Sequence, residues 1–196
     1  LLRSADAGDT YVPLIIEECP RHPDAPEGIP EFYCGSGTKF YPHPQVSGTV
    51  FATVCHNNQL ESGFIKSINH GETWDEGSMT GIDDPYINSL AIHPTDPDKI
   101  VVGTVFGNIF LSEDGGMNWE SISKPSPLNY IAVMAFDPHG SHELWVLGNS
   151  LIKLSGSEYT EWEEVPSPMG EPWELSGNPM FFDLIFSPNE AGTVYI

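Results

Sequence analysis

The sequence has few basic residues. Only 7 of its 196 residues are Lys or Arg, against 28 Asp and Glu, so the formal net charge at pH 7 is −21. A surface of this sign repels phosphate backbones and anionic membrane surfaces. The charge balance therefore predicts no nucleic-acid partner, and it fits an acidic, soluble, secreted surface.

Long apolar runs and helical periodicity are missing as well. No segment approaches the roughly 18 consecutive apolar residues of a membrane span, so we expect no membrane insertion. No apolar pattern of helical period extends over a useful length. Hydrophobic residues make up 39% of the chain, which suits thin sheets whose outer strands face water.

Motifs for metals and cofactors are absent from the sequence. It contains no Asp-x-Asp-x-Asp-Gly loop, and its seven histidines are scattered. His43, His93 and His139 fall in or beside proline-containing turns, where we predict that they are turn residues. We therefore predict no metal site and no cofactor.

Cysteine is scarce, with three residues. Cys19 and Cys34 bracket a proline-rich segment. A disulfide between them would close a loop of roughly 15 residues and contribute about 3 kcal/mol. We predict this disulfide and, because such bonds persist in oxidising compartments, an extracellular or cell-surface location. Cys55 is then a small buried hydrophobe in a strand, since the pair Cys55-His56 lacks the further ligands of a metal site.

Against these absences stands a repeated motif. In residues 107–119 a short strand, Ile109–Leu111, leads into a polar turn that carries Asp114 and ends at Trp119. An Asp in a tight turn accepts backbone N–H bonds, Gly supplies positive φ, and Trp brings a large apolar face with one N–H to satisfy. The same plan occurs four times, at Ser4, Asp6, Gly8 and Tyr11; at Ser67, Asn69, Gly71 and Trp74; at Ser112, Asp114, Gly116 and Trp119; and, in a decayed form, at Ser155 and Trp162.

The shared formula, Ser-x-Asp-x-Gly-x-Thr-Trp, resembles the Asp box (BNR repeat) of sialidases, related glycosidases and VPS10-type receptors. Trp74 and Trp119 are about 45 residues apart, and Trp119 and Trp162 about 43, which is the period of a four-stranded propeller blade. A strand ending in a proline-containing turn precedes each of the last three boxes, at 40–44, 91–94 and 135–138, and another follows the last box at 185–188. We predict an all-β fold, a β-propeller of four-stranded antiparallel blades.

The predicted layout is a single propeller segment over residues 1–196. It comprises a partial blade (1–11), an insertion (12–37), blades at 38–74, 86–119 and 130–162, a linker (163–180) and the start of another blade (181–196). A closed ring needs roughly 4–8 blades, and about three are complete here. We expect the remainder of its own propeller, or associated chains, to close the ring.

In the families that the chain resembles, the box turn lies at the outer periphery, away from the ligand. The resemblance therefore implies structural roles for the box residues. It also implies that ligands meet the loops between blades, here 12–37, 75–86, 120–129 and 163–180. Tyr86, Phe106 and Trp173 are candidates to stack on sugar rings, whereas Phe181 is assigned to the core.

The resemblance also raises two enzymatic interpretations. Sialidase chemistry uses three arginines to hold the substrate carboxylate, and the sequence contains only Arg3 and Arg21, so we expect no sialidase activity. The xyloglucanase-like enzymes use two aspartates facing each other across the sugar. Asp83 and Asp84 are the catalytic candidates. Adjacent strand residues point to opposite faces, so a second acid would have to come from another blade. Otherwise the two acids form a solvated turn before Pro85.

We therefore expect a non-catalytic extracellular module that acts as a scaffold or as a recognition surface for carbohydrate or protein. The alternative is a glycoside hydrolase of the xyloglucanase-like group whose catalytic carboxylates lie partly outside this segment. The repeats are also similar to those of the propeller that helps to assemble photosystem II, although the sequence offers no basic patch.

Overall fold

The computed structural model describes residues 2–3, 12–13, 39–55, 62–84, 86–122, 125, 128–140, 142–166 and 183–196, with only the backbone for 2–3, 12–13, 55 and 62. The regular structure of these residues is entirely β, so they hold no helix that could cross a membrane. The strands are β1 (Leu2–Arg3), β2 (Val12–Pro13), β3 (Phe40–Pro42), β4 (Val50–Cys55), β5 (Ser62–Ser67), β6 (Asp75–Glu76), β7 (Ile87–Ile92), β8 (Ile100–Thr104), β9 (Ile109–Ser112), β10 (Glu120–Ile122), β11 (Ile131–Phe136), β12 (Leu144–Gly148), β13 (Leu151–Ser155), β14 (Glu161–Glu164), β15 (Ile185–Phe186) and β16 (Val194–Tyr195).

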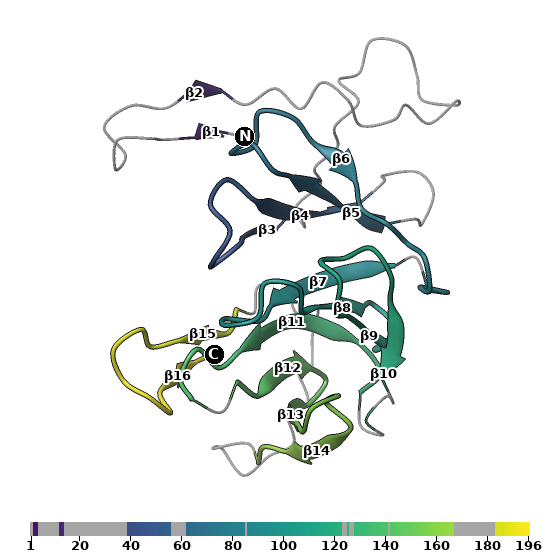
Figure 1. The fold of residues 1–196 in the computed structure, drawn as a ribbon. Helices are drawn as coiled ribbons and strands as arrows, with labels where there is room; N and C mark the ends of the chain where they lie inside the picture. Colours follow the sequence, from purple (N-terminus) through teal and green to yellow (C-terminus); the bar gives the residue numbers. More distant parts are fainter. Residues whose placement is uncertain are drawn as a thin grey trace.

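Three sheets of four antiparallel strands follow one another along the chain (Figure 1). We call them blade 1 (β3–β6), blade 2 (β7–β10) and blade 3 (β11–β14). In each blade the strands pair in sequence order, so every connection joins neighbours. Two further pairs, β1–β2 and β15–β16, form two-stranded sheets. The predicted all-β fold with four-stranded antiparallel blades is confirmed.

Blade 2 is buried on both of its faces. Side chains alternate between the faces of a strand, so β8 and β9 send one set of residues to each neighbour. One set packs with Phe51 and Phe64 of blade 1, and it includes Ile100, Val102 and Phe110. The other packs with Ile131, Leu144 and Ile152 of blade 3, and it includes Val101, Ile109 and Leu111. Because both faces are covered, these strands are continuously apolar rather than alternating.

The fourth strand of each blade is short and acidic. β6 is Asp75–Glu76, β10 begins at Glu120, and all four residues of β14, Glu161–Glu164, are exposed. An outer strand leaves one row of backbone groups without a neighbouring strand, and carboxylates there discourage pairing with other chains. Each blade thus carries carboxylates on its open edge.

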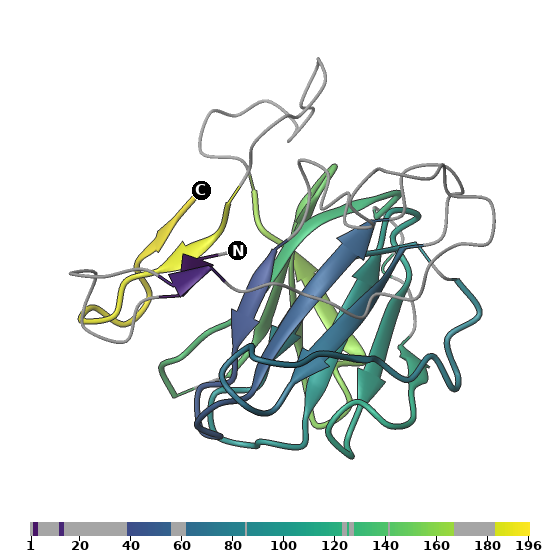
Figure 2. The same ribbon diagram turned by 90° about the horizontal axis from the view of Figure 1, so that it is seen from above.

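The connecting turns gather at two ends of the blades (Figure 2). In an antiparallel sheet the turns after the first and third strands share one end, and the turn after the second strand lies at the other. The first end carries the box turns, residues 67–74, 112–119 and 155–162, and we call it the box end. The opposite end carries the segments that lead into each first strand.

Candidate functional site

The opposite end of blade 2 brings two predicted ligand-stacking residues together. Tyr86 leads into β7, and Phe106 lies in the turn between β8 and β9. The backbone N–H of Val105 donates to the Tyr86 carbonyl at 2.9 Å, which joins the two segments. The rings of Tyr86 and Phe106 then meet edge to face, with centroids 5.1 Å apart and an interplanar angle of 88°. Phe106 is 54% exposed, so it presents an aromatic face to solvent.

Asp84 supports this aromatic pair from below the surface. Its side chain accepts the Tyr86 N–H at Oδ1 (3.2 Å) and an Asn108 Nδ2–H at Oδ2 (2.7 Å). Asn108 is held in turn, because its backbone N–H donates to Thr104 Oγ1 at 3.1 Å. Asp84 is therefore a bracket between the two loops.

One sequence expectation is corrected here. We expected Asp83 and Asp84 to share a solvated turn, but Asp84 is only 8% exposed, while Asp83 is exposed. The reason is that two donors face Asp84 from inside the fold, the Tyr86 N–H and the Asn108 side-chain amide of a distant loop. The partner Asn108 is 24 residues away in the sequence, so no local sequence pattern predicts this hydrogen bond.

Polar side chains also join the first strands of the three blades at this end. Lys39 Nζ donates to the Ala132 carbonyl at 2.6 Å, and Asn88 Nδ2 donates to the Ile131 carbonyl at 2.7 Å. Ser89 Oγ accepts the Met134 N–H at 2.9 Å. Burial lowers the pKa of Lys39, and the charge of Asp183 opposes that shift. Sequence reasoning missed these residues, because only the folded arrangement brings β3, β7 and β11 together.

At the box end, two box turns are built in the same way. Ser112 is fully buried, and its Oγ accepts the Gly116 N–H at 2.9 Å. Asp114 Oδ1 accepts the Met117 and Asn118 N–H groups, each at 2.9 Å. In blade 1 the matching bonds run from Gly71 N to Ser67 Oγ (2.8 Å) and from Thr73 N to Asn69 Oδ1 (2.9 Å). An amide oxygen thus replaces the carboxylate without changing the turn.

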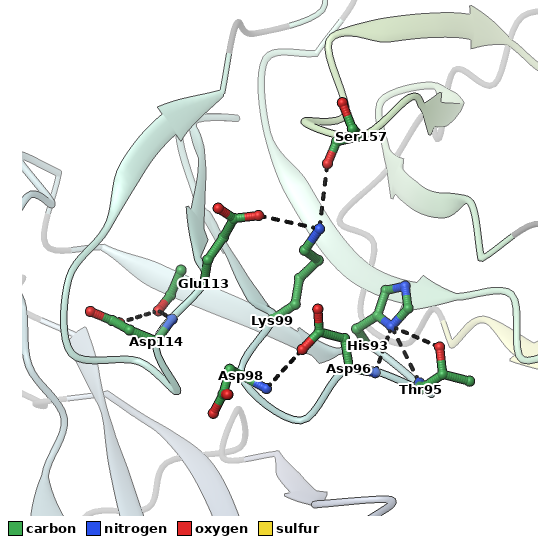
Figure 3. A network of polar contacts seen from close by, with 9 residues as sticks. His93, Thr95, Asp96, Asp98, Lys99, Glu113, Asp114 and Ser157 are labelled. Atoms are coloured by element: carbon green, nitrogen blue, oxygen red, sulfur yellow. Dashed lines mark hydrogen bonds and ion pairs between the residues drawn. The ribbon is translucent and has the colours of Figure 1, made fainter.

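Charge distinguishes the two turns, although their geometry is shared. Asp114 lies on the surface, and its second oxygen accepts a hydrogen bond from Asn118 Nδ2 at 2.7 Å (the Asp114 turn is seen in Figure 3). The Asn118 side chain, the Asn118 N–H and the Ser112 hydroxyl hold the pKa of Asp114 well below its usual range. Both oxygens of the Asp114 carboxylate thus accept hydrogen bonds from residues of its own turn.

The aromatic residues that end the box turns differ in burial. Trp74 is 6% and Trp119 4% exposed, whereas Trp162 is 44% exposed. In blade 3 the buried aromatic is Tyr159, which has φ of 52° and packs against Phe136 with ring centroids 5.5 Å apart. Burial and the nearby charges of Asp96 and Glu113 raise the pKa of Tyr159 to about 12. In the decayed box, Tyr159 therefore takes the buried position that Trp74 and Trp119 hold in the other two turns.

The residue before proline caps the turn that follows the first strand. His43 Nδ1 accepts the Gln45 and Val46 N–H groups, and His93 Nδ1 accepts those of Thr95 and Asp96. Two oxygens occupy the same place in later repeats: Asp137 Oδ1 accepts the His139 N–H, and Ser187 Oγ accepts the Asn189 and Glu190 N–H groups. The structure therefore shows His43 and His93 as capping residues. No group of three or more His, Cys, Asp or Glu suited to a metal ion occurs in the described residues.

Several predicted site residues lie outside the part of the chain that the structure describes. They are the first box (Ser4, Asp6, Gly8 and Tyr11), the predicted disulfide (Cys19 and Cys34) and the third stacking candidate (Trp173). Their roles stay predictions.

No protein-family model matches the sequence, and no curated protein is significantly similar to it. Solved structures do share its fold. The GH74 enzyme of Niastella koreensis matches with a TM-score of 0.50 and 20% identity, over 67% of this chain and 23% of its own. The GH74 xyloglucanase of Xanthomonas campestris gives 0.50 and 17%, over 64% and 23%. An ancestral GH74 enzyme gives 0.50 and 18%, over 66% and 18%.

The chain thus spans about a fifth of the length of these proteins, between 18% and 23%. At such identities the likeness establishes the fold alone. Together with the three antiparallel blades, it shows that this chain has the fold of part of a β-propeller.

Proposed function

We propose that this chain is a non-catalytic recognition module of an Asp-box propeller, and that it binds carbohydrate or protein at the opposite end of blade 2. The observation that supports it is the exposed Phe106 ring held edge to face on Tyr86. Asp84 and Asn108 fix the two loops beneath the pair, so the ring is presented from a rigid frame. A preorganised aromatic surface loses little conformational freedom when a ligand covers it.

The positions of Asp83 and Asp84 favour binding over hydrolysis. Glycoside hydrolysis needs a protonated acid and an ionised partner on opposite sides of one sugar. Both oxygens of Asp84 accept hydrogen bonds from the protein, one from Tyr86 and one from Asn108. Asp83 is exposed on the surface, and no second carboxylate is shown facing it across a cleft in the described residues. Neither acid is placed as a catalytic acid requires.

The charge of the surroundings favours a neutral or cationic ligand. Asp83 is exposed and lies three residues before Tyr86 in the sequence. Each described lysine contacts other parts of the protein: Lys39 the Ala132 carbonyl, Lys66 the Gly115 carbonyl, Lys99 the Glu113 carboxylate and Lys153 the Glu163 carboxylate. An anionic ligand would find little attraction here. A neutral sugar can place its C–H face on the exposed Phe106 ring.

We also propose that the module works outside the cytoplasm. The support is the predicted Cys19–Cys34 disulfide, which would persist in an oxidising compartment. Mass spectrometry of the unreduced protein should find these two thiols bonded. Two free thiols would remove this support.

The test combines binding and turnover. Titration calorimetry with neutral β-glucan oligosaccharides, xyloglucan fragments included, should detect binding that Phe106→Ala weakens about tenfold, the usual weight of one aromatic contact. Ile68→Ala is the matched control, because Ile68 is also exposed, at 68%, but lies at the box end.

Turnover decides between the proposal and its alternative. We expect no hydrolysis of xyloglucan or mixed-linkage glucan. Hydrolysis that falls about a hundredfold or more in Asp83→Asn or Asp84→Asn would instead establish the xyloglucanase-like alternative. Binding of a protein ligand that depends on Phe106, without sugar binding, would assign the same surface to protein recognition.

A further inference from the structure

His93 occupies the seam between blades 2 and 3 at the box end (Figure 3). It follows β7 directly and is 9% exposed. Its Nδ1 accepts the backbone N–H of Thr95 at 3.2 Å and that of Asp96 at 3.0 Å. The other side of the ring meets blade 3, with centroids 5.2 Å from Phe136 and 5.0 Å from His142. One imidazole therefore caps a turn in its own blade and packs against the next.

This geometry requires a neutral ring. Two N–H groups point at Nδ1, so the lone pair is there and the ring proton is on Nε2. A second proton would go to Nδ1, where it would face both donors and remove the acceptor. The turn at 93–96 would then lose two of its hydrogen bonds at once.

The charged groups around His93 act in the same direction, with one exception. From its own blade, Lys99 repels a positive ring and Asp96 attracts it, and Lys99 is itself paired with Glu113 at 3.3 Å. From blade 3, His142 adds repulsion, and its Nδ1 lies 3.2 Å from the Asp137 carbonyl. The Tyr159 phenol borders the same seam, near Asp96 and Glu113, and stays neutral over the physiological range. Burial first, and then His142 and Lys99, lower the pKa of His93.

We propose that His93 is an acid-sensitive latch: its protonation at Nδ1 opens the 93–96 turn and loosens the seam between blades 2 and 3 at the box end. The repeats of the chain supply the comparison. Asp137 and Ser187 hold the same position after their strands and cap the same turn with oxygen. Of these caps, the one at 93 is both an imidazole and packed against the ring of another histidine.

The direction of the pH effect follows from proton linkage. An unfolded His takes up a proton near pH 6.5, whereas folded His93 resists it, so the unfolded state binds more protons below that pH. The contribution of His93 to the free energy of unfolding is constant above about pH 7 and falls as the pH drops through 6.5. This contribution alone raises the unfolding equilibrium constant by up to about tenfold between pH 7.5 and 5.5. Net charge has the opposite effect, because acid reduces the self-repulsion of a chain of charge −21.

The experiment measures urea unfolding of the wild type, His93→Asn and His93→Ser at pH 7.5 and 5.5. Asn and Ser keep an oxygen acceptor, as Ser187 does, and do not titrate in this range. Both variants lose ring packing and are less stable at pH 7.5, but their stability should decline less toward pH 5.5 than that of the wild type, because the His43 cap is present in all three proteins. Variants whose stability declines as steeply as that of the wild type between pH 7.5 and 5.5 would overturn the latch.

Hydrogen exchange in the wild type gives a second readout that needs no variant. The Thr95 and Asp96 amides donate to His93, and the Asn189 and Glu190 amides donate to Ser187. The intrinsic pH dependence of exchange affects both pairs, so the ratio of their protection factors reports the turn alone. We expect protection of the first pair to fall up to tenfold relative to the second between pH 7.5 and 5.5. A constant ratio would contradict the proposal.

Discussion

The Trp119 indole donates its Nε1–H to the carbonyl of Ser78 in the segment that leaves blade 1, at 2.8 Å. The Trp119 backbone N–H donates to Thr80 of the same segment at 2.9 Å, and the ring meets Phe64 edge to face at 5.6 Å. A box-turn tryptophan of blade 2 is therefore a contact of blade 1. Trp74, in contrast, donates to Gly71 within its own turn, at 3.1 Å.

This difference leads to the first prediction. Trp119→Phe keeps an aromatic ring but leaves the Ser78 carbonyl without its donor and a small void in the seam. We expect a loss of about 1–3 kcal/mol in the free energy of unfolding. Urea unfolding measures it, with Trp74→Phe as the comparison for a bond made within one blade. A Trp119→Phe protein within about 0.5 kcal/mol of wild type would show that the bond between blades contributes little.

The second prediction concerns the buried hydroxyl of the box turn. Ser112→Ala removes the acceptor of the buried Gly116 N–H and should cost about 1–3 kcal/mol. Ser121→Ala is the control, because Ser121 belongs to the same blade but is exposed. Equal effects of the two changes in thermal unfolding would argue against a buried capping role for Ser112.

The third prediction is the pH response of Asp114. Hydrogen bonds from the Asn118 side chain, the Asn118 N–H and Ser112 hold its pKa well below the usual value near 3.9. A lowered acid pKa contributes stability that is complete above the unfolded pKa and is lost as the pH falls below about 4. The side-chain carboxyl ¹³C shift should therefore titrate at a clearly lower pH than an ordinary Asp.

Asp114→Asn supplies the control for this response. Asn69 fills the same position in blade 1 and accepts the Thr73 N–H without a charge. The variant should keep the turn, and its free energy of unfolding should fall less than that of the wild type as the pH drops below 4. A carboxyl shift that titrates near 4 in the wild type would refute the assigned hydrogen bonds.

The fourth prediction separates the two neighbouring acids. Asp84→Asn places an amide where both Tyr86 and Asn108 donate, and only one of its two polar atoms can accept. We expect a loss of about 1–3 kcal/mol in unfolding free energy, with weaker ordering of the Tyr86–Phe106 pair. Asp83→Asn is exposed and should stay within about 0.5 kcal/mol of wild type. Reversed effects would mean that Asp83 is the bracket between the loops.

The contrast between these sites explains what the sequence could predict. The box turn is local: Ser112, Asp114 and their donors lie within seven residues, so pattern and spacing suffice to predict the turn. Repetition of that pattern then predicts the blades. The bracket between Asp84 and Asn108 spans 24 residues, and the Lys39 bond to Ala132 spans 93. Such contacts depend on the twist and stacking of whole blades, which no short pattern encodes.

The same reasoning applies to the residue before each proline. His43, His93, Asp137 and Ser187 look unrelated as side chains, yet each offers an acceptor at the same place in its turn. The sequence shows the prolines and the period, but equivalence between an imidazole, a carboxylate and a hydroxyl appears only in the hydrogen bonds. Burial is equally hidden, as the exposed Trp162 and the buried Tyr159 show within one turn.

The last prediction tests how closely blade 2 approaches blade 1. Gly81 has φ of +97°, and a Cβ built there would collide with the backbone carbonyl oxygen of Trp119. Gly140 has φ of +70°, but a Cβ there meets nothing within 4 Å. Alanine at either position bears the cost of positive φ, about 1–2 kcal/mol, and Gly81→Ala must also displace a backbone. We expect Gly81→Ala to lose about 1–3 kcal/mol more than Gly140→Ala in urea unfolding.

Since the backbone strain is common to both, the difference isolates the contact between Gly81 and Trp119. Equal losses would mean that the segment leaving blade 1 can move away from Trp119 at no cost, and that the seam is looser than the packing of Trp119 against Phe64 indicates.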